Sequence, residues 1–157
     1  MRVLALIALL LSMSLIGCGK KEESAPAAAG SSSSGGSSAV VKESKYDKGP
    51  RAAEEDVDEA LAKVGEGLFS TKGCTACHAF GQKMSGPDMA GVTRRRTSKW
   101  MEQQILHPDL MTKEDPIARQ LFATHALQMP NQGLTEDEAK SVIEYLKARD
   151  RADGAGH

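Results

Sequence analysis

Apolar residues recur every three or four positions over much of the chain between residues 52 and 152, and we find no strand-like alternation there. This spacing predicts α-helices, because residues three and four apart share one helix face. Four helices are expected, over residues 54 to about 71, 98 to 107, from 115 onward, and from 135 to about 151.

Residues at the expected helix ends support these boundaries. Ser98 is a reasonable N-cap, and Pro108 closes the second helix. Asp115-Pro116 places an N-cap before a proline at the first helical position, and Thr135-Glu136-Asp137-Glu138 is a capping box. The predicted fold is all-α, with a domain over residues 52–152 and a frayed tail over 153–157.

The first 17 residues are typical of a secretory leader, with Arg2 before a short apolar run. Leu15-Ile16-Gly17-Cys18 resembles the bacterial lipobox, in which cleavage precedes the cysteine and its sulfur receives a diacylglycerol. We therefore predict a lipoprotein signal over residues 1–17 and lipid attachment at Cys18. The alternative is an ordinary signal peptide that happens to contain a cysteine.

Residues 18–51 are rich in Gly, Ser and Ala, a composition that buries too little apolar surface to fold. They are expected to form a flexible tether, either for movement between partners or as a plain spacer. Of the 20 basic residues only Arg2 leaves with the leader, so the rest of the chain, with 21 acidic residues, is slightly acidic. This balance argues against nucleic-acid binding.

The pentapeptide Cys74-Thr75-Ala76-Cys77-His78 has the spacing of a covalent haem attachment site. Two thiols add to the haem vinyl groups, and the adjacent histidine is the proximal iron ligand. A zinc site or a redox dithiol is the alternative for a bare C-x-x-C. A zinc site would need further Cys or His ligands, and the only other cysteine is Cys18. A redox dithiol would need a βαβ context, and no strand-like alternation lies nearby.

Aromatic residues are scarce in the predicted domain, so its core is thin for its length. They are Phe69, Phe80, Trp100, Phe122 and Tyr145. A covalent haem would supply the missing apolar mass, and the haem-free domain is expected to fold poorly.

Met129 is the preferred candidate for the second axial ligand. It lies in the polar segment Gln128-Met129-Pro130-Asn131 before the last helix, and a thioether suits haem iron. Packing of Met129 in the core is the alternative. The competing ligands are Met84, Met89, Met101, Met111, His107 and His125.

With these motifs the chain resembles class I c-type cytochromes, which are small monohaem electron carriers, over about residues 60–148. The resemblance rests on Gly65-Glu66-Gly67-Leu68-Phe69, the C-x-x-C-H motif, Gly86-Pro87-Asp88-Met89-Ala90-Gly91-Val92, Met129-Pro130 and the last helix. It implies a class I fold in which the last helix crosses the first, so that Gly65 and Phe69 meet Tyr145 and Leu146. It also implies that the Pro87 carbonyl accepts a hydrogen bond from His78 Nδ1. The long polar stretch 107–128 departs from the minimal family pattern.

The positive run Arg94-Arg95-Arg96 with Lys99 is expected on the haem side by family position. Arg94 and its neighbours would bind haem propionates or an acidic partner, or else form a solvated loop. Trp100 would donate its indole N–H to a propionate, or else pack in the core.

These observations predict an extracytoplasmic, lipid-anchored monohaem cytochrome c that passes single electrons between redox proteins. The expected partners are a respiratory complex or a periplasmic reductase or oxidase. Two axial protein ligands leave no site for a small-molecule substrate, so no enzyme activity is expected. The alternatives are a haem enzyme or gas sensor with an open distal site, for which His125 is a candidate distal residue, or a docked subunit of a larger oxidase or reductase.

Overall fold

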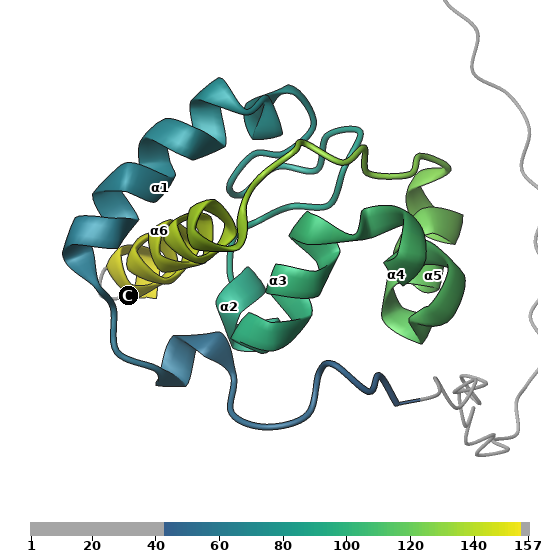
Figure 1. Cartoon of the computed structure of the whole chain (residues 1–157), viewed down its shortest axis with the longest axis horizontal. Helices are drawn as coiled ribbons and strands as arrows, with labels where there is room; N and C mark the ends of the chain where they lie inside the picture. Colours follow the sequence, from purple (N-terminus) through teal and green to yellow (C-terminus); the bar gives the residue numbers. More distant parts are fainter. Residues whose placement is uncertain (1–42, 155–157) are drawn as a thin grey trace, which may run out of the picture. The chain divides into compact units, whose positions relative to one another are not determined.

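A computed structural model describes residues 43–154, which are helical with irregular connections and contain no β-strand (Figure 1). Cys18, the predicted leader and residues 155–157 lie outside the described residues. The helices are η1 (Ala52–Glu54), α1 (Glu59–Thr71), η2 (Cys74–Ala76), α2 (Val92–Arg95), α3 (Ser98–Leu106), α4 (Pro108–Glu114), α5 (Pro116–His125) and α6 (Glu136–Gly154). Within residues 43–154, none of them is long and apolar enough to span a membrane.

The predicted all-α fold is confirmed, with shifts at the helix starts. The first helix begins at Glu59, because Asp58 Oδ1 accepts hydrogen bonds from the backbone N–H groups of Ala60 and Leu61, both at 3.0 Å. Thr97 caps α3 through its contact with the Trp100 amide at 3.1 Å, so the N-cap lies one residue before the predicted Ser98. Both shifts follow from which oxygen reaches the free amides of the first turn.

Two short helices, α2 and α4, were not predicted. Pro108 does close α3, but it also occupies the first position of α4, where its missing N–H costs nothing. The polar segment 107–128 is thus a pair of helices, α4 and α5, that pack on each other. Asp115 caps α5 as predicted, accepting from the amides of Ile117 and Ala118 at 3.0 Å each.

The first and last helices of the domain cross, as the family resemblance implied (Figure 1). Gly65 is buried at this crossing, and a Cβ atom built on it would lie 1.9 Å from the Ser141 carbonyl oxygen. The Phe69 and Tyr145 rings lie nearby, 5.5 Å apart between centroids. Glycine therefore permits a backbone-to-backbone approach, and its nearest contact is the Ser141 backbone rather than the predicted Tyr145 side chain.

The tail of α6 is fixed by the buried carboxylate of Asp150. Its oxygens accept from the amides of Gly91 and Thr93, at 2.5 and 2.9 Å, and from the Thr93 hydroxyl at 2.6 Å. These bonds join α6 to the start of α2. Residues 153–154, which were assigned to a frayed tail, are the last residues of α6.

Residues 43–51 pack against the domain, which differs from the predicted tether over 18–51. Ser44 is buried and its hydroxyl donates to the Asp115 carboxylate. Asp47 Oδ1 accepts from the Thr97 amide at 2.8 Å, and the Arg51 guanidinium donates to the Arg95 carbonyl at 3.1 Å. Polar contacts with distant residues order this segment, and composition alone does not reveal them.

Candidate haem-binding site

An apolar cavity in the domain gathers the chemistry-bearing residues of the sequence analysis. Cys74, Cys77, His78, Pro87 and Met129 all line it. Its apolar walls include Phe69 of α1, Val92 of α2, Met101 and Ile105 of α3, Leu121 of α5, and Val142 and Leu146 of α6. Residues distant in sequence therefore share one largely apolar cavity.

The attachment motif follows α1 through a sharp turn. Gly73 has φ +80°, a left-handed conformation that favours glycine, and η2 begins at Cys74. Cys74 and Cys77 are half-buried, and the His78 amide donates to the Cys74 carbonyl at 3.0 Å. This local fold presents both thiols and the imidazole to the cavity.

The zinc and redox-dithiol alternatives find little support in the site. No group of three or more His, Cys, Asp or Glu side chains is placed to hold a metal ion within residues 43–154. Burial raises the pKa of the Cys74 thiol, whereas redox-active C-x-x-C thiols have a lowered pKa.

The segment 85–88 packs against the His78 ring. Its Nδ1 lies 2.9 Å from the Pro87 carbonyl oxygen, which is the contact that the resemblance implied. Because a carbonyl only accepts, the proton is on Nδ1, and Nε2 is left with its lone pair free for a metal. Gly86 is part of this support: a Cβ atom there would lie 2.6 Å from His78 Cε1. Gly86 belongs to a motif that carries the family resemblance, but its close approach to the His78 ring was not predicted.

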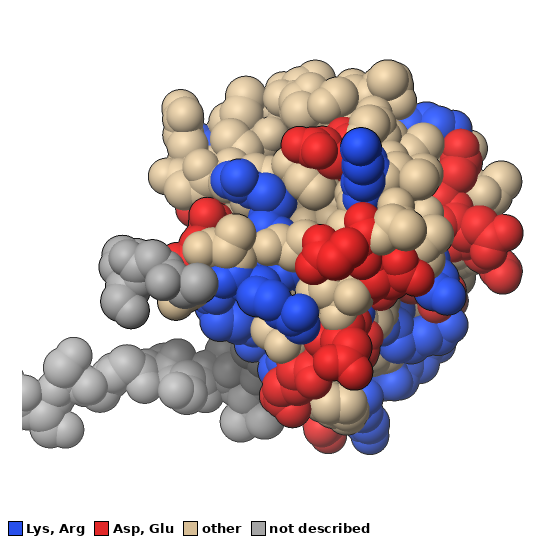
Figure 2. Space-filling view, turned by 90° about the vertical axis from the view of Figure 1, so that its left-hand side faces the viewer, with Lys and Arg blue, Asp and Glu red and all other residues tan. Residues whose placement is uncertain are grey.

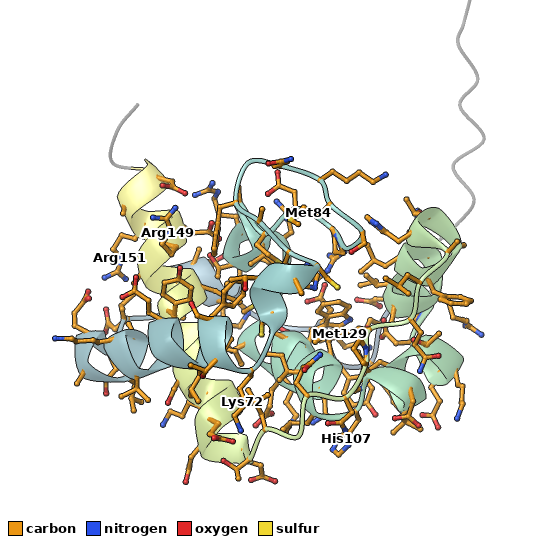
Figure 3. All side chains as sticks on the ribbon, turned by 90° about the horizontal axis from the view of Figure 1, so that it is seen from above. Lys72, Met84, His107, Met129, Arg149 and Arg151 are labelled. Atoms are coloured by element: carbon orange, nitrogen blue, oxygen red, sulfur yellow. The ribbon has the colours of Figure 1, made fainter. Side chains whose placement is uncertain are left out.

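Met129 is half-buried in the loop between α5 and α6, and its sulfur faces α3. Gln104 Nε2 lies 3.8 Å from Met129 Sδ, and Asn131 Nδ2 donates to the Leu106 carbonyl at 2.9 Å. In Figure 3 Met129 lies near the centre of the view, whereas His107 lies at its edge. The Gln104 and Asn131 contacts thus both connect the methionine loop to α3.

The competing ligands divide into those outside the cavity and those that line it. Met84 is 39% exposed, His107 is exposed, and neither lines the cavity; Met111 is buried in the core outside it. Met89 and Met101 do line the cavity. His125 also lines it, and its Nδ1 lies 3.1 Å from the Ser85 carbonyl oxygen, the same type of contact that His78 makes with Pro87.

Trp100 packs in the core, which was the alternative prediction, and Arg94 is bonded to α6. The Trp100 indole N–H donates to buried Asp115 at 3.0 Å rather than pointing at a propionate site. Arg94 donates to the Asp150 carbonyl at 3.0 Å and does not line the cavity. A buried carboxylate and a helix end thus satisfy these two donors.

Arg95 and Arg96 are the members of the basic run that reach the cavity wall. Arg96 lies 5.1 Å from the Trp100 ring centroid, and burial lowers its pKa, although a guanidinium keeps its charge at neutral pH. Elsewhere charges are mixed: on the side of the molecule shown in Figure 2, acidic and basic side chains lie interspersed rather than in separate patches.

The donor set fits a covalent haem. Two thiols at attachment spacing, an imidazole with a fixed tautomer and a thioether line one cavity with apolar walls. Arg95 and Arg96 also line the cavity, and their guanidinium groups already donate, Arg95 to the Ala90 and Asp88 carbonyls and Arg96 to the Asp47 carboxylate.

Comparison with known proteins agrees with this site. The family model "Cytochrome c" matches residues 62–150. Cytochrome c-551 of Azotobacter vinelandii is 32% identical over 54% of this chain and 95% of its own length, and cytochrome c-551 of Stutzerimonas stutzeri is 30% identical over 55% and 78%.

Solved structures show the same relation. Cytochrome c from Rhodothermus marinus superposes with a TM-score of 0.60 at 33% identity, covering 65% of this chain and 96% of that protein. An engineered form of it gives a TM-score of 0.59 at 32% identity, covering 64% and 96%. The chain belongs to the cytochrome c family, and it is accordingly an electron carrier with covalently bound haem c rather than an enzyme.

Proposed function

We propose that this protein is a lipid-anchored, monohaem electron carrier outside the cytoplasm, in which Cys74 and Cys77 hold the haem and His78 and Met129 ligate its iron. The observation that carries the proposal is the convergence of all four side chains on one apolar cavity. Its partners are redox proteins, either a respiratory complex or a periplasmic reductase or oxidase.

The residues of the site suit rapid single-electron exchange. The bound haem supplies the one-electron couple. The Pro87 carbonyl keeps the proton on His78 Nδ1, which fixes both the tautomer and the ring orientation. The cavity wall is apolar, and a soft thioether ligand would favour reduced iron. With His78 and Met129 both as ligands, the coordination of the iron would change little when its oxidation state changes.

Replacing Met129 by alanine tests the ligand assignment. The parent ferric protein is expected to show the weak far-red absorption band of methionine sulfur on haem iron, and Met129→Ala is expected to lose it completely. The reduced variant should also bind carbon monoxide rapidly, because the sixth position is then open. Visible spectra of both oxidation states measure these effects.

Met84→Ala is the matched control, because Met84 is an exposed methionine outside the cavity. It should leave the far-red band unchanged. A band that survives in Met129→Ala would assign the sulfur to another methionine. A parent without the band, and with rapid carbon monoxide binding, would favour an open distal site.

The lipid anchor is tested by Cys18→Ser. The proposal rests on Leu15-Ile16-Gly17-Cys18, whose resemblance to a lipobox places the acyl chains on this sulfur. The parent should fractionate with membranes, with a mature N-terminal peptide whose mass includes the lipid, and Cys18→Ser should lose both properties. Gly19→Ala is the control and should remain membrane-bound. An unmodified Cys18 in the parent would contradict the anchor while leaving the haem assignment intact.

A further inference from the structure

Helix α3 contacts the methionine loop through two side-chain hydrogen bonds with opposite directions. Gln104 extends from α3 to the loop, with Nε2 3.8 Å from Met129 Sδ, a distance within the range for a sulfur acceptor. Asn131 extends from the loop to α3, donating to the Leu106 carbonyl at 2.9 Å. One bond therefore ties the Asn131 side chain of the loop to the α3 backbone, and the other reaches the Met129 sulfur itself.

The helix that carries Gln104 is firmly placed. Thr97 caps its first turn at 3.1 Å, and the side chains of Trp100 and Met101 are buried. The Trp100 indole is in turn bonded to the buried Asp115 carboxylate at 3.0 Å. A donor on such a helix has a fixed position relative to the cavity, whereas Met129 lies in a loop without regular structure.

The orientation of the Gln104 amide shows which contact determines it. Its Oε1 atom is buried and has no hydrogen-bond partner within residues 43–154, which is an unfavourable state for an acceptor. A thioether sulfur only accepts hydrogen bonds, so of the two ends of the amide only the NH₂ group suits the sulfur. The amide is thus oriented with its NH₂ group toward the sulfur.

We propose that Gln104 is a positioning residue for Met129, which holds the thioether in place and tunes it as an iron ligand. This inference rests on the proposed axial role of Met129. Sulfur has two lone pairs, and an N–H bond to one of them leaves the other for the iron and draws electron density from the sulfur. A weaker donor stabilises ferric iron less, so the hydrogen bond raises the reduction potential.

The test compares Gln104→Leu with Gln103→Leu in the haem-loaded protein. Gln103 precedes Gln104 on α3 and does not line the cavity. Gln103→Leu is therefore the same substitution at a position away from the sulfur. Losing the bond in Gln104→Leu should shift the equilibrium toward oxidised iron about fivefold, or about 40 mV at 59 mV per tenfold for one electron. Gln103→Leu should keep the parental potential in direct voltammetry.

The far-red band separates the two levels of the proposal. A band in the parent and in Gln104→Leu, with an unchanged potential, would overturn the role of Gln104 alone. A parent without the band would instead reject Met129 as the ligand. Gln104→Ala is the second variant, because it also lacks the N–H but has a different shape. A lowered potential in both Gln104 variants supports the hydrogen bond, and a lowered potential in Gln104→Leu only would overturn it in favour of a packing effect.

Discussion

Gly65→Ala is expected to destabilise the folded, haem-loaded domain by at least about 3 kcal/mol, a large part of the 5–15 kcal/mol typical of a domain. The added Cβ would lie 1.9 Å from the Ser141 carbonyl oxygen and 2.4 Å from its carbon. Both atoms belong to the backbone of α6, so no side-chain rotation relieves the clash. The helices must separate, and the packing of Phe69 on Tyr145 loosens with them.

Gly67→Ala is a matched control on the same helix. Gly67 is exposed, and nothing lies within 4 Å of a Cβ atom built there. Because alanine favours helix over glycine by about 0.5–1 kcal/mol, this variant should be slightly stabilised. Thermal and denaturant unfolding should show that the two substitutions change the free energy of unfolding in opposite directions. The thermal midpoint of Gly65→Ala should lie more than about 10 °C below that of the parent. Equal behaviour of the two variants would show that α1 and α6 do not approach as closely as described.

Removing both attachment thiols, in Cys74→Ser with Cys77→Ser, is expected to abolish cooperative folding. The cavity wall includes core residues of α1, α3 and α6, so without haem these side chains face empty or wet space. A domain of this size has little apolar burial in reserve, and each unfilled core position costs about 2–5 kcal/mol. Circular dichroism at 25 °C should show loss of most helical signal and no sharp thermal transition.

Thr75→Ala is the control for this variant, because Thr75 is exposed and lies between the two thiols. It should retain haem and unfold cooperatively after the same maturation. If the double serine variant unfolds as sharply as Thr75→Ala, the protein side chains alone form a sufficient core, and the domain does not need haem to fold.

Local sequence signals predicted the parts of the fold that depend on neighbouring residues. Asp115-Pro116 and Thr135-Glu138 marked helix starts because their capping oxygens act within three residues; Glu138 accepts from the Thr135 amide at 2.9 Å. That bond, and then Lys72, lowers the pKa of Glu138. Pro108 predicted the end of α3 but not the start of α4. Proline both stops a preceding helix and starts a following one, and only tertiary packing decides whether the second helix forms.

Contacts between distant residues were the parts that sequence could not give. Composition placed residues 43–51 in the tether, but Ser44 and Asp47 are fixed by Asp115 and Thr97, which lie far along the chain. The basic run was predicted on the haem side; Arg95 and Arg96 line the cavity, whereas Arg94 is bonded to α6. Gln104 carries no local signal, because a glutamine on a helix is usually solvated.

The α1–α6 crossing has a consequence for the order of events during biosynthesis. Its two helices lie at opposite ends of the domain, so closing it brings together residues on either side of the haem segment. Such non-local pairing must follow the synthesis of the C-terminal helix, and it is slow because a long loop has to close first. Until then the surface of α1 around Gly65 has no partner. The C-terminal helix is therefore the last element that the fold requires, and α1 reaches its native packing only when that helix is present.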